Sequence, residues 1–267
     1  AAELSHAYGA LVGVDRDAIT AGCNQAFCVA VSALAEPGDS IVVVTPYYFN
    51  HDMWLDLQGV EARYLHAGAD GIPDVDRLGS LVDDRTRAAL LVSPGNPTGV
   101  TIPPEVIHAF ADESQRLGIV LMLDETYRVY RSTEAPAHDL FANADWAGHV
   151  VSLHSFSKDL AIAGYRVGAL VASPLLIDQS LKSLDCVTIS APRVGQEAAL
   201  AGLLHAATWR REQVDRIGAL QQAFEAAMSS RPGGFELVTA GAYFGWVRHP
   251  FEGVGSVDVV RRLIVDN

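Results

Sequence analysis

The sequence predicts an α/β fold with three layers, in which a mostly parallel sheet is covered by helices on both faces. Two observations indicate this fold. Runs such as Ile119–Leu123 are apolar throughout, which is typical of parallel strands that are buried on both sides. These runs alternate along the chain with helical patterns such as Pro103–Leu117, which begins with two prolines and is followed directly by Gly118.

Composition narrows the class of protein. The 267 residues are 49% hydrophobic, which allows a large core, and no apolar run is long enough to span a bilayer. The 19 Lys+Arg and 32 Asp+Glu give a net charge of −13, which argues against nucleic acid or an anionic membrane as a partner. Cys23, Cys28 and Cys186 form no CxxC pair, which favours reduced thiols and a cytoplasmic protein.

The N-terminal half alternates helices and strands that are separated by turn-forming residues. Gly9 ends the first predicted helix, and Glu36–Asp39 reads E-P-G-D, a turn sequence. The predicted elements are, in order, a helix at Glu3–Tyr8, a strand at Ile19–Ala21, a helix ending near Ala35, a strand at Ile41–Val44, a helix at Asn50–Gly59, a strand at Val60–Leu65, a short helix at Asp74–Leu81 and a strand at Thr86–Ser93.

The C-terminal half continues this alternation before the pattern changes. A long helical stretch at Ala191–Met228 is typical of a connection between domains, and Pro232–Gly234 ends it. We therefore expect a large domain at residues 1–190, followed at 191–267 by an interdomain helix and the start of a small α+β C-terminal domain. The other predicted elements are a helix at Pro103–Leu117, strands at Ile119–Leu123, from Val150 and at Val167–Ala172, strands within Phe235–Val247 and a helix at Val257–Ile264.

Polar residues follow four of the predicted strands, and ligands bind at the carboxyl ends of strands in open α/β sheets. By itself, Asn96 in G-N-P-T-G also fits a plain β-turn. Lys158 follows a buried strand and is flanked by small hydroxyl residues. Such a lysine can lose its proton and condense with an aldehyde, although an ordinary surface lysine in a turn fits the same residues. The four residues are Tyr48, Asn96, Asp124 and Lys158.

An anion site is predicted at Gly22, Cys23 and Asn24, where a strand, a glycine bend and a helix meet. Free backbone N–H groups and the helix dipole would point at one place there, with an ordinary strand-to-helix turn as the alternative. The Arg166 guanidinium matches phosphate in shape, and a surface salt bridge is its alternative. Asp124 ends a buried strand and needs a cation or a hydrogen-bond donor, unless it caps a helix.

Five motifs occur in a fixed order along the chain. They are G-x-x-Q-A from Gly22, P-Y-Y from Pro46, N-P-T-G from Asn96, D-E-x-Y from Asp124 and S-x-S-K-x-x-x-x-x-G-x-R-x-G from Ser155. The set resembles the class I/II aminotransferases, fold-type I enzymes of the aspartate aminotransferase superfamily that depend on pyridoxal 5'-phosphate (PLP). The resemblance runs from about Glu3 to the end of the chain. It implies the major domain of a PLP-dependent transferase, with an antiparallel strand at Val167–Ala172.

The resemblance also implies a role for each site residue. Lys158 would carry the cofactor and later move a proton, and Asp124 would keep the cofactor ring nitrogen protonated. Tyr127 and Asn96 would bond the ring oxygen, while Tyr48 would stack on the ring. The residues implied around the phosphate are Gly22, Cys23, Asn24, Ser155 and Arg166, and Ser157 fits the motif without an assigned contact.

The activity implied is the transfer of an amino group between an L-amino acid and a 2-oxo acid, by a homodimer without a metal ion. Other fold-type I PLP enzymes, namely C–S lyases, decarboxylases and synthases, share these motifs. The PLP-sensing domain of a transcription regulator is a further alternative. Relative to the family, we expect the chain to begin after an N-terminal segment and to end at Asn267, before the arginine that would bind the substrate carboxylate.

Overall fold

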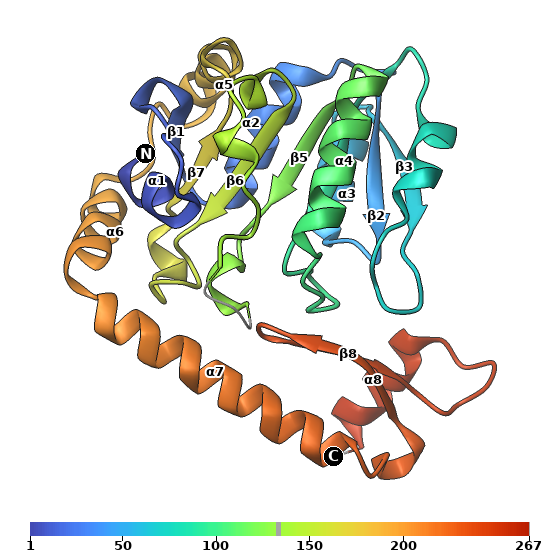
Figure 1. Ribbon diagram of the computed structural model, residues 1–267. Helices are drawn as coiled ribbons and strands as arrows, with labels where there is room; N and C mark the ends of the chain where they lie inside the picture. Colours follow the sequence, from blue (N-terminus) through green and yellow to red (C-terminus); the bar gives the residue numbers. More distant parts are fainter. Residues whose placement is uncertain (132–134, 267) are drawn as a thin grey trace.

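The computed structural model describes residues 1–131 and 135–266, and these residues form a seven-stranded sheet with the order β1-β7-β6-β5-β4-β2-β3 (Figure 1). All neighbouring pairs from β3 to β6 are parallel, whereas β7 is antiparallel to both β6 and β1. The mostly parallel α/β sheet and its antiparallel strand are confirmed. The strands are β1 (Asp17–Thr20), β2 (Ser40–Thr45), β3 (Glu61–His66), β4 (Thr86–Val92), β5 (Val120–Asp124), β6 (Val150–Ser155) and β7 (Gly168–Val171).

Helices cover both faces of this sheet and complete the three layers. Figure 1 shows α4 in front of the sheet and α2 and α3 behind it. Side chains of β5 point alternately to the two faces of the sheet and so reach both core clusters. Leu121 and Leu123 pack in the cluster that includes α4, while Met122 packs in the cluster that includes α2. The helices around the sheet are α1 (Ala2–Tyr8), α2 (Cys23–Leu34), α3 (Phe49–Leu57), α4 (Pro104–Leu117) and α5 (Pro174–Val187).

One of these helices, α5, has no counterpart in the sequence prediction. Its start is nevertheless encoded locally, because the Ser173 hydroxyl accepts a hydrogen bond from the Leu176 backbone N–H at 3.2 Å and Pro174 occupies the first helical position. Short 3-10 helices connect other elements. They are η1 (Val14–Arg16), η2 (Val75–Leu81), η3 (Arg128–Tyr130), η4 (Leu140–Ala142), η5 (Trp146–Gly148), η6 (Ala163–Tyr165) and η7 (Pro232–Gly234).

The long helical stretch predicted at Ala191–Met228 is two helices, α6 (Arg193–His205) and α7 (Ala207–Met228), which meet at Ala206. Figure 1 shows α7 leading away from the sheet to the hairpin of β8 (Glu236–Gly241) and β9 (Phe244–Arg248), followed by α8 (Ser256–Val265). Asn267, the last residue of the predicted second domain, lies outside the described residues. None of the helices in the described part of the chain has the length and apolar character needed to cross a membrane.

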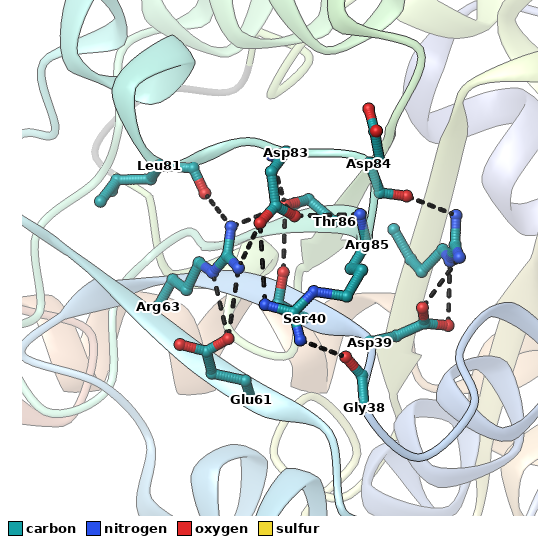
Figure 2. Close-up of polar contacts among 11 residues, drawn as sticks. Gly38, Asp39, Ser40, Glu61, Arg63, Leu81, Asp83, Asp84, Arg85 and Thr86 are labelled. Carbon is teal, nitrogen blue, oxygen red and sulfur yellow. Dashed lines mark hydrogen bonds and ion pairs between the residues drawn. The ribbon is translucent and has the colours of Figure 1, made fainter.

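The amino ends of β2, β3 and β4 carry a network of ion pairs (Figure 2). Arg63 on β3 lies 2.7 Å from Asp83 and 3.2 Å from Glu61, measured from Nη2 to the carboxylate oxygens. Arg87 on β4 donates two hydrogen bonds, of 2.8 and 2.9 Å, to the Asp39 carboxylate. The hydrogen bond with Arg63 lowers the pKa of Asp83 to about 2. The charges at this end of the sheet are therefore neutralised by one another.

Candidate active site

A cavity of about 420 Å³ lies at the carboxyl ends of the strands. Lys158 follows β6, Asp124 ends β5, Asn96 follows β4 and Tyr48 follows β2, so the parallel strands bring all four to one edge. Ten of the eleven predicted site residues line the cavity, and Gly22 lies next to it. The lining residues are Cys23, Asn24, Tyr48, Val92, Asn96, Asp124, Thr126, Tyr127, Ser155, Ser157, Lys158, Ala163 and Arg166.

One corner of the cavity is formed by the start of α2 and by Arg166. Gly22 precedes α2 with a φ of +87°, and a Cβ atom there would lie 2.2 Å from Arg166 Nη2. Arg166 itself has a φ of +53°, and its Nη1 donates to the Ala163 carbonyl at 2.8 Å and to the Ser157 hydroxyl at 3.4 Å. The first backbone N–H groups of α2 are therefore held beside a guanidinium, which is an arrangement suited to an anion.

Asp124 is buried in the floor of the cavity with 5% of its surface exposed. His51 Nε2 lies 3.2 Å from one carboxylate oxygen, while the Thr126 backbone N–H donates to the other at 3.0 Å. Burial acts to raise the pKa of Asp124, but the hydrogen bonds from His51 and Thr126 outweigh it and hold the pKa below its usual value. Asp124 is therefore a buried carboxylate that keeps its negative charge at neutral pH.

Cys23 lies on the other side of this carboxylate. Its Sγ donates to the same Asp124 oxygen as Thr126, at 3.6 Å. Burial, together with the negative charge of Asp124, raises the pKa of the Cys23 thiol well above its usual value. This cysteine therefore stays protonated and serves as a hydrogen-bond donor rather than as a nucleophile.

Lys158 and Tyr127 face the cavity from neighbouring loops. The Lys158 carbonyl accepts hydrogen bonds from the Tyr130 hydroxyl at 2.8 Å and from the Ala161 N–H at 3.2 Å, which fixes the backbone that carries the amine. Tyr127 is 7% exposed, and burial together with the charge of Asp124 raises its pKa above the ordinary value. The Tyr127 hydroxyl therefore keeps its proton and can donate a hydrogen bond.

Tyr48 and Asn96 form the remaining walls. The Tyr48 hydroxyl accepts a hydrogen bond from Asn50 Nδ2 at 2.8 Å, and its ring meets that of His51 edge to face, with centroids 5.2 Å apart. The ring is half-buried, so part of its surface remains open to the cavity. Asn96 precedes a cis peptide bond to Pro97 and is also half-buried.

The β8–β9 hairpin reaches the rim of the site from the far end of the chain. The Tyr243 hydroxyl donates to the Tyr130 hydroxyl at 2.7 Å, and the Phe244 ring lies 5.0 Å from that of Tyr127. Thr239 donates to the Thr98 carbonyl at 2.8 Å, which ties the hairpin to the loop that contains Asn96. The hairpin therefore stabilises the loops that present the polar residues.

The sequence prediction did not include His51, Thr126, Val92 or Ala163 among the site residues. Of these, His51 matters most because it contacts Asp124. The sequence contained a signal for this contact, because a buried acid such as Asp124 needs a hydrogen-bond donor. His51 is a possible donor, since it is the third residue of the helix that follows Tyr48. Val92 adds non-polar wall, and Ala163 contributes the backbone carbonyl that accepts from Arg166 Nη1, so no residue type could mark either of them in advance.

Comparison with known proteins assigns the family. The family model for aminotransferases of class I and II matches residues 1–264. The chain belongs to this family. The aromatic aminotransferase ISS1 of Arabidopsis thaliana is 29% identical over 256 residues, which cover 92% of this chain and 63% of that protein. The valine–pyruvate aminotransferase of Mycobacterium tuberculosis is 29% identical over 216 residues, which cover 78% of this chain and 53% of that protein. The chain thus spans about half to two thirds of the length of these relatives.

Solved aminotransferase structures share the fold. The aromatic aminotransferase from Pyrococcus horikoshii matches with a TM-score of 0.91 at 21% identity, covering 99% of this chain and 72% of that one. The aspartate aminotransferase from Thermus thermophilus with maleate matches with a TM-score of 0.88 at 22% identity, covering 98% and 69% of the two chains. These likenesses confirm the α/β fold.

Members of the class I and II aminotransferase family use pyridoxal phosphate. The cavity fits this group in two respects. A Cβ atom at Gly22 would fill the space beside Arg166, so the glycine keeps open a corner of N–H groups and guanidinium that suits a phosphate. Elsewhere in the cavity lining, Asp124 is a buried carboxylate held in its charged form, which suits a protonated ring nitrogen.

Proposed function

We propose that this protein binds PLP in the cavity and transfers an amino group between an L-amino acid and a 2-oxo acid. The observation that carries the proposal is the convergence of Lys158, Asp124 and Arg166 on one cavity of suitable size. A lysine amine, a buried carboxylate and an anion corner are the three groups that the chemistry needs. Membership of the aminotransferase family supports the same activity.

In this proposal, the residues around the α2 corner bind the phosphate. Arg166 contributes a guanidinium, and Ser155 contributes a hydroxyl. Ser157 accepts a hydrogen bond from Arg166 Nη1 and so orients the guanidinium. The backbone N–H groups of residues 22–24 and the dipole of α2 add further attraction for the anion. Tyr48 packs its open ring face against the cofactor ring.

The bound cofactor would supply an aldehyde that condenses with amines and a ring that accepts electrons. Lys158 Nζ would hold the cofactor, and as a free amine it would take the proton from the substrate Cα atom. Asp124 keeps a proton on the ring nitrogen through its negative charge. The Tyr127 hydroxyl and the Asn96 amide donate hydrogen bonds to the ring oxygen.

We further propose a cytoplasmic homodimer. Apolar side chains on α6 are open to solvent, with Val194 65%, Leu200 52% and Leu204 65% exposed, and a partner subunit would cover them. The three free cysteines are consistent with a reducing compartment. Light scattering on the purified protein tests the dimer, and a monomer that turns over substrate would contradict it.

The sequence offers a matched pair of variants to test the activity, because it contains only two lysines. Lys182 lies on α5, where its Nζ donates to Gln179 at 2.8 Å. We expect Lys158→Ala to lower kcat/KM for 2-oxo acid formation by about a thousandfold or more, because it removes the proton-transfer group. Lys182→Ala should retain activity. Equal activity of the two variants, or release of ammonia or CO2 in place of amino transfer, would contradict the proposal.

A further inference from the structure

A chain of two tyrosine hydroxyls joins the β8–β9 hairpin to the backbone of Lys158. The Tyr130 hydroxyl donates to the Lys158 carbonyl oxygen at 2.8 Å, and the Tyr243 hydroxyl donates to the Tyr130 oxygen at 2.7 Å. A carbonyl oxygen only accepts, so Tyr130 uses its single hydrogen on Lys158 and must accept from Tyr243. The direction of both hydrogen bonds is therefore fixed.

The first tyrosine of this chain is shielded from water, whereas the second is not. Tyr130 is 8% exposed and Tyr243 is 47% exposed. Burial raises the pKa of Tyr130 above its ordinary value, so this hydroxyl keeps its proton at neutral pH. Hydrogen bonds in a chain polarise one another, and a hydroxyl that accepts one bond donates a stronger one. Tyr243 can therefore strengthen the bond between Tyr130 and Lys158.

The hairpin turn that presents Tyr243 is held in place by its backbone. Ala242, the residue before Tyr243, has a φ of +47° although it is not glycine, and it is 5% exposed. A Cβ atom at Gly241 would overlap the Gly99 carbonyl oxygen, so the two backbones lie in direct contact. Such unfavourable backbone conformations persist where the surrounding structure enforces them, and they occur often at functional sites. The turn therefore presents the Tyr243 hydroxyl from a fixed position.

A second contact holds the same loop from α7. Asp159 follows Lys158 directly, is 4% exposed and accepts two hydrogen bonds from Arg210, at 2.7 and 2.9 Å. Arg210 Nη2 also lies 2.8 Å from Glu3 on α1. The loop that carries the lysine is thus anchored through Asp159 to α7, while the tyrosine chain reaches Lys158 itself from the hairpin.

We propose that Tyr130 and Tyr243 are positioning residues for the Lys158 amine, so that the β8–β9 hairpin controls how readily this lysine attaches to the cofactor. Lys158 Nζ has no hydrogen bond or ion pair among the described residues, so its place in the cavity depends on the backbone that carries it. A group held in place reacts faster, because it loses less freedom on reaction. The ordering of the backbone stands on the hydrogen bonds alone, whereas the effect on the cofactor rests on the proposed function.

The presence of only two lysines in the sequence allows a direct measurement on the purified protein. Lysine labelled with ¹³C at the carbonyl gives one signal for Lys158 and one for Lys182, which lies on α5 and serves as an internal reference. A carbonyl ¹³C resonance moves when its hydrogen bond weakens. We expect Tyr243→Phe to shift the Lys158 signal in the same direction as Tyr130→Phe and by less. Neither variant should shift the Lys182 signal.

The rate at which PLP attaches to Lys158, followed by borohydride trapping, measures the consequence for the cofactor. We expect Tyr243→Phe to lower this rate about threefold and Tyr130→Phe about tenfold, which is within the range of one neutral hydrogen bond. The double variant should match Tyr130→Phe, because Tyr243 acts through the Tyr130 hydroxyl. Tyr64→Phe is the matched control, since Tyr64 is 41% exposed and donates to Asp52 at 2.7 Å, and it should leave the rate unchanged.

An unchanged Lys158 carbonyl resonance in Tyr243→Phe would overturn the proposal, and so would an unchanged rate. A double variant that shows the full effects of both substitutions would also overturn it, because loosening of the hairpin would then explain the loss. Tyr243→Phe keeps the ring of an exposed residue, so its comparison with wild type decides the question even if Tyr130→Phe fails to fold. If PLP attaches to neither lysine of the wild-type protein, the proposed function fails, and the carbonyl resonance still decides whether the tyrosine chain orders the Lys158 backbone.

Discussion

The two ends of the parallel strands use charged residues in opposite ways. At the amino ends, Arg63 pairs with Asp83 and Arg87 pairs with Asp39, so each cation has carboxylate partners. At the carboxyl ends, the Lys158 amine has no hydrogen bond or ion pair within the described residues, and it faces a cavity. Paired charges add a little stability, whereas unpaired groups around a cavity are available to a ligand.

Backbone conformation also differs between the two ends of the parallel strands. Gly38, at the amino end, has a φ of +95°, but a Cβ atom there would meet nothing within 4 Å. Gly22, at the carboxyl end, has a similar φ of +87° and lies against the Arg166 guanidinium. Arg166 also holds a positive φ without being glycine. In this comparison, the positive φ angles that occur beside a close neighbour or at a residue other than glycine lie at the carboxyl ends of the strands, which we propose to be the functional end.

Among variants that compare the two ends of the strands, matched carboxylate variants should give the largest difference in activity. We expect Asp124→Ala to lower kcat/KM by about ten- to a hundredfold, because a hydrogen bond to a charged group contributes about 1.5–3 kcal/mol. Asp83→Ala, at the opposite end of the sheet, should leave kcat/KM within about twofold of wild type, since surface changes have small effects. Steady-state kinetics measures both. An Asp124→Ala protein with bound cofactor and unchanged turnover would mean that this acid has only a structural role.

Matched glycine variants should give a smaller difference, in cofactor affinity. Gly22→Ala and Gly38→Ala both place a side chain at a positive φ, so both should lose some stability. Only Gly22→Ala also pushes against Arg166, and we expect it to raise the dissociation constant of PLP about tenfold, the loss of about one anion contact. Absorbance titration with PLP measures this. Equal PLP affinities of the two variants would mean that the Gly22 corner does not hold the phosphate.

The smallest expected effect is a change of stability with pH, and it concerns only the amino ends of the strands. The pKa of Asp83 is lowered to about 2 in the folded protein by its hydrogen bond with Arg63, against about 3.9 in an unfolded chain. A depressed folded pKa stabilises the protein above the unfolded value, and this stabilisation is lost as the pH falls from about 4 to about 2.

Comparison of melting temperatures with Asp83→Asn tests this window. The wild-type protein should melt higher at pH 5, and the gap between the two should shrink on acidification. Asp83 is solvent-exposed, so the gap should be small, and added salt should narrow it further. A gap that stays constant between pH 5 and the lowest pH at which the protein remains folded would indicate that the ion pair contributes nothing.

The sequence predicted the strands and the polar residues at their carboxyl ends because both signals are local. A buried parallel strand such as β5 is a continuous apolar run, and Asp124 ends it visibly. The partners of those residues could not be predicted in the same way. His51 reaches Asp124 from a different strand connection, and the Tyr243 hairpin meets Tyr130 from 113 residues further along the chain. Such contacts depend on tertiary packing.

The observed helices differ from the predicted ones in two places, for different reasons. The sequence prediction overlooked α5 although its signals are local: Ser173 and Pro174 form a helix start, and Ile177, Leu181 and Leu184 follow at helical spacing. The predicted helical stretch across Ala206 is broken without any proline or glycine at that position. Residue propensities favour a helix there, so only the packing of the surrounding chain could reveal the break.

The most direct test of the central claim is to find which lysine carries the cofactor. Borohydride reduction of the PLP-loaded protein would fix the cofactor to its lysine, and peptide mapping by mass spectrometry would locate the label. With only Lys158 and Lys182 in the sequence, the result is a choice between the cavity at the carboxyl ends of the strands and the surface of α5. We predict the label on Lys158, and a label on Lys182 alone would contradict the proposed active site.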